Sequence, residues 1–164
     1  NIDPKIIRTE INILKKIGAK VIIKKNELQI IGNKNIKNIN INTAPYPGFP
    51  TDLQAQMMVL LCKANKKSII EENIFENRFM HVSELNRMGA QISINGNKAL
   101  ISGSIKFAPA ELMATDLRAS VSLVLAALGA KGKSVINRIY HLDRGYEDIE
   151  KKLKSVGAKI KRIN

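Results

Sequence analysis

The sequence predicts an α/β fold, in the broad sense that includes α+β, built from repeated βαβαββ-type units. The prediction depends on a recurring Gly-Ala junction, an apolar face before each junction and a β-like run after it. The junctions begin at Gly18, Gly89 and Gly157, which lie 71 and 68 residues apart. Apolar residues stand one and four positions before each glycine, a spacing that builds one helical face. A glycine just past such a face favours the left-handed conformation that ends a helix.

The run after each junction is typical of a β-hairpin. Residues 91–94 alternate in polarity, Asn95-Gly96 favours a tight turn, and residues 99–101 form the return strand. The first copy repeats this pattern over residues 21–31. The third copy has no return strand before the sequence stops, so we expect an incomplete repeat there.

A Thr-Asp pair opens a long apolar run twice in the chain, at Asp52 and at Asp116. Each threonine is a plausible helix N-cap, and an acid in the first helical turn is stabilised by the helix dipole. The runs themselves, residues 57–62 and 121–128, are apolar on all sides. Such helices are expected to be buried rather than half-exposed.

A short β-rich segment follows each of these helices, at residues 68–70 and 134–136, and a loop with Arg78 or Arg144 comes next. One repeat therefore reads as buried helix, strand, arginine-bearing loop, amphipathic helix, Gly-Ala and hairpin. Such repeats bury their apolar faces against one another. We expect a single incomplete domain over residues 1–164, made of a partial repeat at 1–50, a complete one at 51–114 and a partial one at 115–164.

Composition excludes several classes of protein. The sequence has no apolar run of 18 or more residues, so no membrane span is expected. One cysteine excludes an internal disulfide framework and agrees with a cytoplasmic location. The first residues do not resemble a signal peptide, and they lack an initiator methionine, which agrees with truncation. No metal-ligand spacing is present, and we expect no metal and no cofactor.

The net charge of +13 has two interpretations. It could mark a nucleic-acid-binding surface. Alternatively, it reflects a compositional bias, because lysine is spread along the chain beside abundant isoleucine and asparagine. Aromatic residues make up only 4% of the chain, which leaves few stacking platforms for single strands. We therefore expect no nucleic-acid partner, and a basic surface suited to anionic small molecules.

Five blocks of sequence carry a family resemblance. The most distinctive are Thr-Ala-Pro-Tyr-Pro-Gly-Phe-Pro-Thr-Asp-Leu-Gln-Ala-Gln at 43–56 and Met-Ala-Thr-Asp-Leu-Arg-Ala-Ser at 113–120; the others are residues 74–82, 84–90 and 138–147. In this order they resemble the UDP-N-acetylglucosamine 1-carboxyvinyltransferases, which belong to the enolpyruvyl transferase family. The related 5-enolpyruvylshikimate 3-phosphate synthases share the architecture but not these blocks.

The resemblance implies an inside-out α/β barrel domain, one of two similar domains with the active site in the cleft between them. This chain resembles the C-terminal portion, so the N-terminal half of the enzyme would be its partner and would supply the missing return strand. Such enzymes transfer the enolpyruvyl group of phosphoenolpyruvate to the 3′-hydroxyl of UDP-N-acetylglucosamine, releasing phosphate, in the committed step of peptidoglycan synthesis.

The resemblance also assigns site residues. Asp52 would be the base that contacts the sugar 3′-hydroxyl, since a carboxylate can accept its proton; by residue type alone it could equally be an ordinary helix acid. Ile74 would meet the nucleotide sugar through its backbone. Arg144 would bind phosphoenolpyruvate or the leaving phosphate, with a guanidinium fork suited to both. Arg78 and Arg118 are weaker anion-binding candidates, with surface or interdomain salt bridges as the alternative. Asp116 would orient arginines.

Cys62 and His141 are assigned no chemistry. The family's reactive cysteine, the target of fosfomycin, belongs to a mobile loop of the other domain. Cys62 lies inside the apolar run at 57–62, so we expect a buried and inert thiol. His141 could carry a proton, but a structural role or a place at the cleft rim is the simpler interpretation.

Two hypotheses compete with a transferase segment that is inactive by itself. The first is a non-catalytic remnant that binds nucleotide sugars. The second is binding of nucleic acid through bulk charge, which predicts a steep dependence of affinity on salt concentration.

Overall fold

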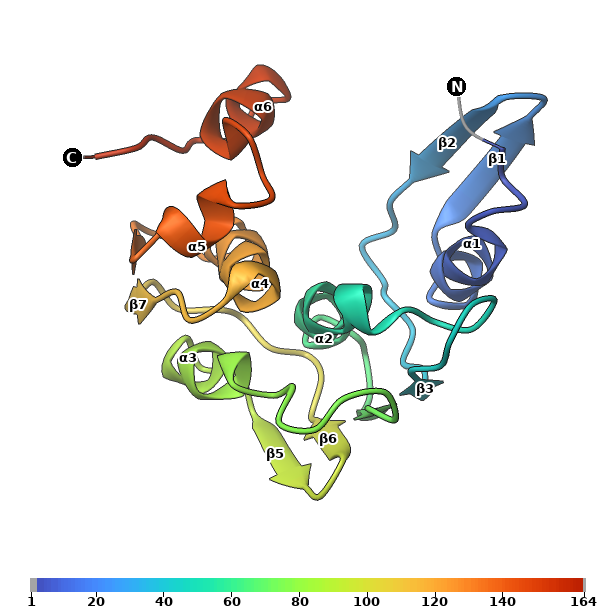
Figure 1. Ribbon diagram of the computed structural model, residues 1–164, viewed down its shortest axis with the longest axis horizontal. Helices are drawn as coiled ribbons and strands as arrows, with labels where there is room; N and C mark the ends of the chain where they lie inside the picture. The colour runs from blue at the N-terminus through green and yellow to red at the C-terminus, as the bar shows by residue number, and fades with distance from the viewer. Residues whose placement is uncertain (1–2, 164) are drawn as a thin grey trace. The chain divides into compact units, whose positions relative to one another are not determined.

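The computed structural model describes residues 3–163, and the described chain divides into two compact units (Figure 1). The first unit contains the residues up to Phe79 together with Gln91–Ile105. The second unit contains Met80–Ala90 and the residues from Lys106 onward. Within residues 3–163, no helix is both long enough and apolar enough to cross a bilayer.

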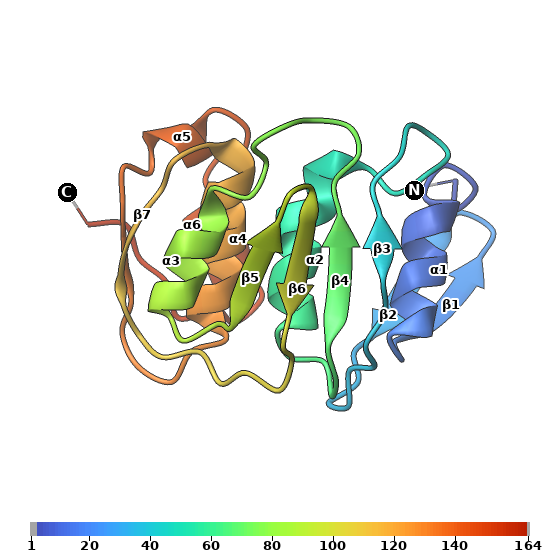
Figure 2. The same ribbon diagram turned by 90° about the horizontal axis from the view of Figure 1, so that it is seen from below.

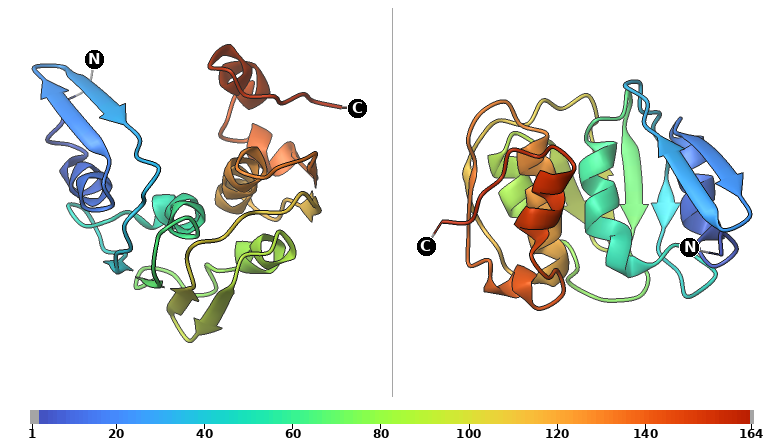
Figure 3. Two further views of the ribbon diagram at one scale, coloured as in Figure 1. Left: turned by 180° about the vertical axis from the view of Figure 1, so that it is seen from behind. Right: turned by 90° about the horizontal axis from the view of Figure 1, so that it is seen from above.

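The first unit is built around a four-stranded sheet in the order β3-β4-β6-β5 (Figure 2). Strand β3 runs parallel to β4, whereas the β4-β6 and β6-β5 pairs are antiparallel. Helix α2 lies against this sheet beside β4, and a separate hairpin of β1 and β2 lies next to helix α1 (Figure 3). The elements are α1 Arg8–Lys16, β1 Lys20–Lys24, β2 Glu27–Ile31, β3 Ile41–Asn42, the 3-10 turn η1 Thr51–Leu53, α2 Gln54–Leu61, β4 Ser68–Glu71, β5 Ile92–Asn95 and β6 Lys98–Ile101.

The core of the first unit lies between α2 and the sheet. Met58 and Leu61 on α2 are fully buried, as are Ile70, Ala99 and Ile101 on the strands. Burying a large aliphatic side chain is worth about 1.5–3 kcal/mol. The buried helix and the following strand predicted for the middle copy are both present, and the apolar run at 57–62 lies in the buried segment of α2 and its C-cap.

The second unit is a layer of helices beside a two-stranded parallel sheet. Helix α4 contacts both α3 and α5, and β7 pairs with β8. Val121, Val124, Leu142 and Ile149 form its buried cluster, with Leu153 packed at the edge. The elements are α3 His81–Arg87, β7 Glu111–Met113, α4 Leu117–Leu128, β8 Val135–Asn137, α5 Tyr140–Asp143 and α6 Ile149–Ser155.

The three Gly-Ala junctions end their helices in the same way, as the repeat predicts. Gly18, Gly89 and Gly157 have φ values of 103°, 87° and 96°, in the left-handed region that favours glycine. The alanine amide after each glycine donates to a carbonyl five residues back, with N···O distances of 2.9, 3.1 and 3.0 Å. This is the hydrogen bond that defines a Schellman motif.

The hairpin predicted at Asn95-Gly96 is confirmed, but its turn lies one residue further along. Asn95 pairs with Lys98, so the two loop residues are Gly96 and Asn97. Gly96 has a φ of 57°, and glycine is the preferred residue when the first loop position has positive φ.

The expectation that threonine caps both buried helices was wrong. Asp116 is the N-cap of α4, and its carboxylate accepts from the amides of Arg118 and Ala119 at 2.8 and 3.0 Å. Thr51 instead begins the 3-10 turn before α2, and its hydroxyl donates to Glu72. Aspartate and threonine have comparable capping ability, and the extended backbone of Asp116 (φ −154°, ψ 173°) places its carboxylate over the helix end.

Arg144 lies in a turn segment, as the sequence pattern predicted, but a short helix comes directly before it. The residues before it form the short helix α5, and Arg144 is the C-cap of that helix. The predicted loop is therefore shorter than expected. Arg78 also lies in a turn segment, between β4 and α3, as predicted.

Candidate functional site

Asp52 lies at the point where two helical segments join. Thr51–Leu53 form the 3-10 turn η1, and α2 begins at the next residue, Gln54. Pro50 is extended, with φ −70° and ψ 136°, and it directs the chain into this turn. The side chain of Asp52 is exposed, and it stands at the amino end of α2, where the helix dipole favours a negative charge. The side chain is thus accessible beside a helix end.

A buried carboxylate, Glu72, connects the segments around Asp52. Glu72 is only 3% exposed. Its Oε1 accepts from Thr43 Oγ1 (2.9 Å) and from the amides of Ile74 (2.9 Å) and Phe75 (3.2 Å). Its Oε2 accepts from Thr51 Oγ1 at 2.8 Å. The turn that carries Asp52 and the loop that carries Ile74 are therefore tied to the same side chain.

Sequence reasoning did not assign a role to Glu72, although the pattern contained a signal. Ser68, Ile70 and Glu72 alternate inward along and just past β4, and all three are buried. Strand side chains point to opposite faces in turn, so a buried Ile70 places Glu72 on the inner face and Glu71 on the outer one. An acid on an inner face requires hydrogen-bond partners.

The loop after β4 contains two predicted site residues. The amide of Ile74 is occupied by Glu72, so a backbone contact to a ligand would fall to the Ile74 carbonyl. The guanidinium of Arg78 lies over the ring of Phe75, 4.4 Å from its centroid. Such a cation–π contact holds an arginine without neutralising its charge. The first unit thus holds Asp52, Ile74 and Arg78.

The remaining predicted residues belong to the second unit. Asp116 and Arg118 stand at the start of α4, and Arg144 is exposed at the end of α5. A Cβ on Gly145 would lie 2.8 Å from Leu117 Cδ2, so this glycine lies close against the Leu117 side chain. Because Leu117 stands between Asp116 and Arg118, the structure brings the segments of all three predicted residues together.

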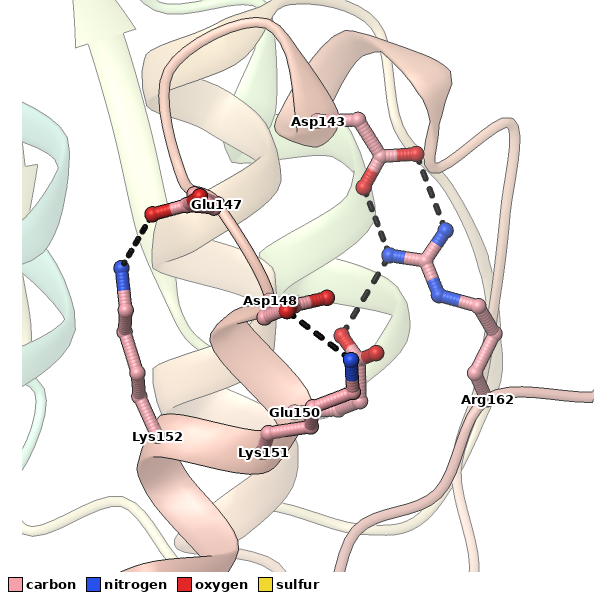
Figure 4. Close-up of polar contacts among 7 residues, drawn as sticks. All are labelled: Asp143, Glu147, Asp148, Glu150, Lys151, Lys152 and Arg162. Carbon is pink, nitrogen blue, oxygen red and sulfur yellow. Dashed lines mark hydrogen bonds and ion pairs between the residues drawn. The ribbon is translucent and has the colours of Figure 1, made fainter.

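Asp143, the residue before Arg144, has an ion-pair partner (Figure 4). Arg162 donates to Asp143 through both terminal guanidinium nitrogens, at 2.9 and 2.6 Å, and one of them also donates to Glu150 at 3.3 Å. The hydrogen bond from Arg162 lowers the pKa of Asp143 below its ordinary value. The pair is partly exposed, so we expect it to contribute little stability by itself. Its effect is to occupy Asp143, which leaves Arg144 outside this pairing.

A cavity of about 680 Å³ in the second unit is a separate feature. Its walls come mainly from α4, β8, α6 and the residues after α6, and they include Val124, Leu142 and Arg162. None of Asp116, Arg118 and Arg144 lines it. No group of three metal-binding side chains occurs among residues 3–163.

Cys62 is buried, as its place in the apolar run predicts, with no exposed surface. Burial raises the pKa of its thiol from 9.0 to about 12. Since the thiolate is the reactive form, we expect native Cys62 to react with a maleimide at pH 8 roughly a thousandfold more slowly than in guanidinium chloride. Mass spectrometry of the peptide containing Cys62 measures this ratio. Similar native and denatured rates would contradict an inert thiol.

Comparison with known proteins identifies the family. The model of the EPSP synthase (3-phosphoshikimate 1-carboxyvinyltransferase) family matches residues 1–153. The chain is 83% identical over 163 residues to the UDP-N-acetylglucosamine 1-carboxyvinyltransferase of Pelagibacter ubique (strain HTCC1062), and 50% identical over 163 residues to that of Desulfosudis oleivorans (strain DSM 6200 / JCM 39069 / Hxd3). Each match covers 99% of this chain and 39% of the relative, so the chain spans about two fifths of the relatives' length.

Solved structures of enolpyruvyl transferases match the fold of this chain. The enolpyruvyl transferase NikO from Streptomyces tendae matches 94% of this chain and 36% of its own, with a TM-score of 0.87 and 28% identity. An EPSP synthase from Acinetobacter baumannii matches 96% of this chain and 37% of its own, with a TM-score of 0.70 and 14% identity, which shows the fold alone. The predicted fold class is confirmed; the described residues combine helix and sheet and form no closed barrel. The chain therefore belongs to the EPSP synthase (3-phosphoshikimate 1-carboxyvinyltransferase) family.

Proposed function

We propose that this chain is the C-terminal part of a cytoplasmic enzyme that transfers enolpyruvyl from phosphoenolpyruvate to the 3′-hydroxyl of UDP-N-acetylglucosamine. The single observation that carries the proposal is the 83% identity to a relative with that name. The rest of the same enzyme is the partner that completes the site, and phosphate is the second product. We also propose that the repeats at 1–50, 51–114 and 115–164 belong to one incomplete domain.

The reaction requires proton transfer at the sugar and anion binding at phosphoenolpyruvate. Asp52 accepts the proton of the sugar 3′-hydroxyl as the hydroxyl oxygen forms a bond to C2 of phosphoenolpyruvate. At the same time C3 of phosphoenolpyruvate gains a proton from an acid outside this chain. In the second step C3 loses a proton and the bond between C2 and the phosphate oxygen breaks. The exposed side chain of Asp52 supports this role, because the carboxylate can meet a substrate hydroxyl.

Arginines supply the cationic part of the site. Arg144 binds phosphoenolpyruvate or the leaving phosphate through charge-assisted hydrogen bonds, and Arg118 and Arg78 are each weaker candidates for anion binding. Asp116 caps α4 through the amide of Arg118, which fixes the backbone from which that arginine extends. The closeness of Gly145 to Leu117 supports a shared anion-binding group made by Arg144 and Arg118.

A chimera tests the proposed function. This chain replaces the matching segment of the Pelagibacter ubique relative, and phosphate release is measured with phosphoenolpyruvate and either UDP-N-acetylglucosamine or shikimate 3-phosphate. We expect release that requires UDP-N-acetylglucosamine, and none from the 164-residue chain alone. A folded chimera that is inactive with UDP-N-acetylglucosamine, or that prefers shikimate 3-phosphate, would contradict the proposal. Calorimetric titration of UDP-N-acetylglucosamine into that chimera would then identify a protein that only binds.

A further inference from the structure

We propose that Glu72 is a positioning residue for the transfer reaction and acts through the hydroxyl of Thr51 on Asp52. This assignment rests on the proposed function, because Asp52 is the group that it positions. Thr51 and Asp52 are consecutive residues of one 3-10 turn, and the Thr51 hydroxyl donates to Glu72 Oε2 at 2.8 Å. A bond to Thr51 therefore sets the orientation of the turn from which Asp52 extends.

The four hydrogen bonds to Glu72 explain why it is not itself a catalytic residue. A carboxylate offers about four lone-pair sites. Glu72 receives hydrogen bonds from two hydroxyls and two amides, and its side chain is buried. A side chain that is only 3% exposed has little surface with which to meet a substrate hydroxyl. The cost of burying its charge is offset by these bonds, which hold three chain segments in one arrangement.

Thr43 strengthens the arrangement from the opposite side. Its hydroxyl donates to Glu72 Oε1 at 2.9 Å and accepts from the Asn73 amide at 2.8 Å. Thr43 is 1% exposed, so this hydroxyl is fixed in the interior. The backbone over residues 73–75 is thus held at three successive amides, two by Glu72 and one by Thr43. The segment of Ile74 and the turn of Asp52 share one rigid support.

Geometry rather than charge is what this role requires. In Glu72→Gln, the amide oxygen can keep the three donors of Oε1, and the amide nitrogen can donate to Thr51 Oγ1 once that hydroxyl turns to accept. In Glu72→Ala, all four partners lose their acceptor, and buried unsatisfied donors are costly. Glutamine should therefore restore function, and alanine should not.

The decisive variants alter Thr51 in the chimera. Thr51→Val has nearly the same shape but lacks the hydroxyl, whereas Thr51→Ser keeps it. A small misplacement of a reacting group costs up to about a hundredfold in rate, so we expect Thr51→Val to lower kcat by about tenfold to a hundredfold. The KM for phosphoenolpyruvate should change by less than about twofold, since anion binding is untouched. Thr51→Ser should keep most of the kcat that Thr51→Val loses, and Glu72→Gln should keep most of the kcat that Glu72→Ala loses. Glu76→Gln, which removes an exposed acid from the same loop, is the matched control.

Two outcomes would overturn the assignment. One is a Thr51→Val chimera with normal kcat and a lowered Tm, because that would make the bond purely structural. The other comes from hydrogen exchange, which does not depend on turnover. We expect faster exchange over residues 51–56 and 74–75 in Glu72→Ala than in Glu72→Gln. Equal protection in the two variants would refute the positioning role even if the wild-type chimera is inactive. An inactive wild-type chimera with the expected exchange difference would instead refute the proposed function alone.

Discussion

Asp52→Asn in the chimera is expected to lower kcat by about a thousandfold or more. General base catalysis contributes roughly a hundredfold to ten-thousandfold, and the neutral amide of asparagine cannot accept the proton of the sugar hydroxyl. Asparagine has the same shape as aspartate, so the 3-10 turn and the start of α2 should remain in place. The KM values for the two substrates should therefore change much less than kcat.

A matched control separates loss of the base from a general loss of charge. Asp148 is another aspartate near the start of a helix, where it is the N-cap of α6, and it pairs with Lys151 at 2.9 Å. Asp148→Asn also replaces an aspartate near a helix start with asparagine, and we expect its kcat to stay within about twofold of wild type, since exposed ion pairs contribute little. Steady-state phosphate release at saturating substrate measures both variants. A kcat for Asp52→Asn close to that of the control would remove Asp52 from the chemistry.

The parts of the fold that depend on residues close together in the sequence could be predicted from it. The left-handed glycines, the amphipathic helices and the middle hairpin follow from patterns within about ten residues, and the structure confirms them. The error in the helix cap was also local, and it depended on which of two adjacent residues occupies the cap position. A one-residue shift decided whether Thr115 or Asp116 caps α4, and both residue types cap well. Composition alone does not resolve such a choice.

The site was less predictable because its contacts join distant segments. Thr43 and Thr51 reach Glu72 across 29 and 21 residues, and Arg162 reaches Asp143 across 19. No spacing rule encodes these pairs, since each depends on how strands and turns meet in space. The residue types at Asp52 and Arg144 suggested chemistry, but their supports became visible only in the structure.

His81 is a buried group whose ionisation opposes folding. It is 2% exposed, and its Nε2 atom is buried without a hydrogen-bond partner among the described residues. Burial lowers the pKa of His81 from 6.5 to about 4, although the charge of nearby Asp116 acts in the opposite direction. The folded protein therefore keeps a neutral imidazole beside the start of α4 at pH values where an exposed histidine is already charged.

The consequence is a loss of stability in mild acid. As the pH falls below 6.5 the unfolded chain binds a proton at His81 before the folded chain does, so the free energy of unfolding falls until about pH 4 and then levels off. A pKa shift of this size lowers the free energy of unfolding by about 3 kcal/mol between pH 7 and pH 4, and this loss is absent above pH 7.

His81→Phe replaces the imidazole with a ring that cannot ionise, so the stability of this variant relative to wild type should rise by about that amount on acidification. Urea unfolding of the chimera at the two pH values measures the difference, and His141→Phe is the control that should retain the wild-type acid sensitivity. The same acid sensitivity in His81→Phe as in wild type would show that some other group controls acid unfolding.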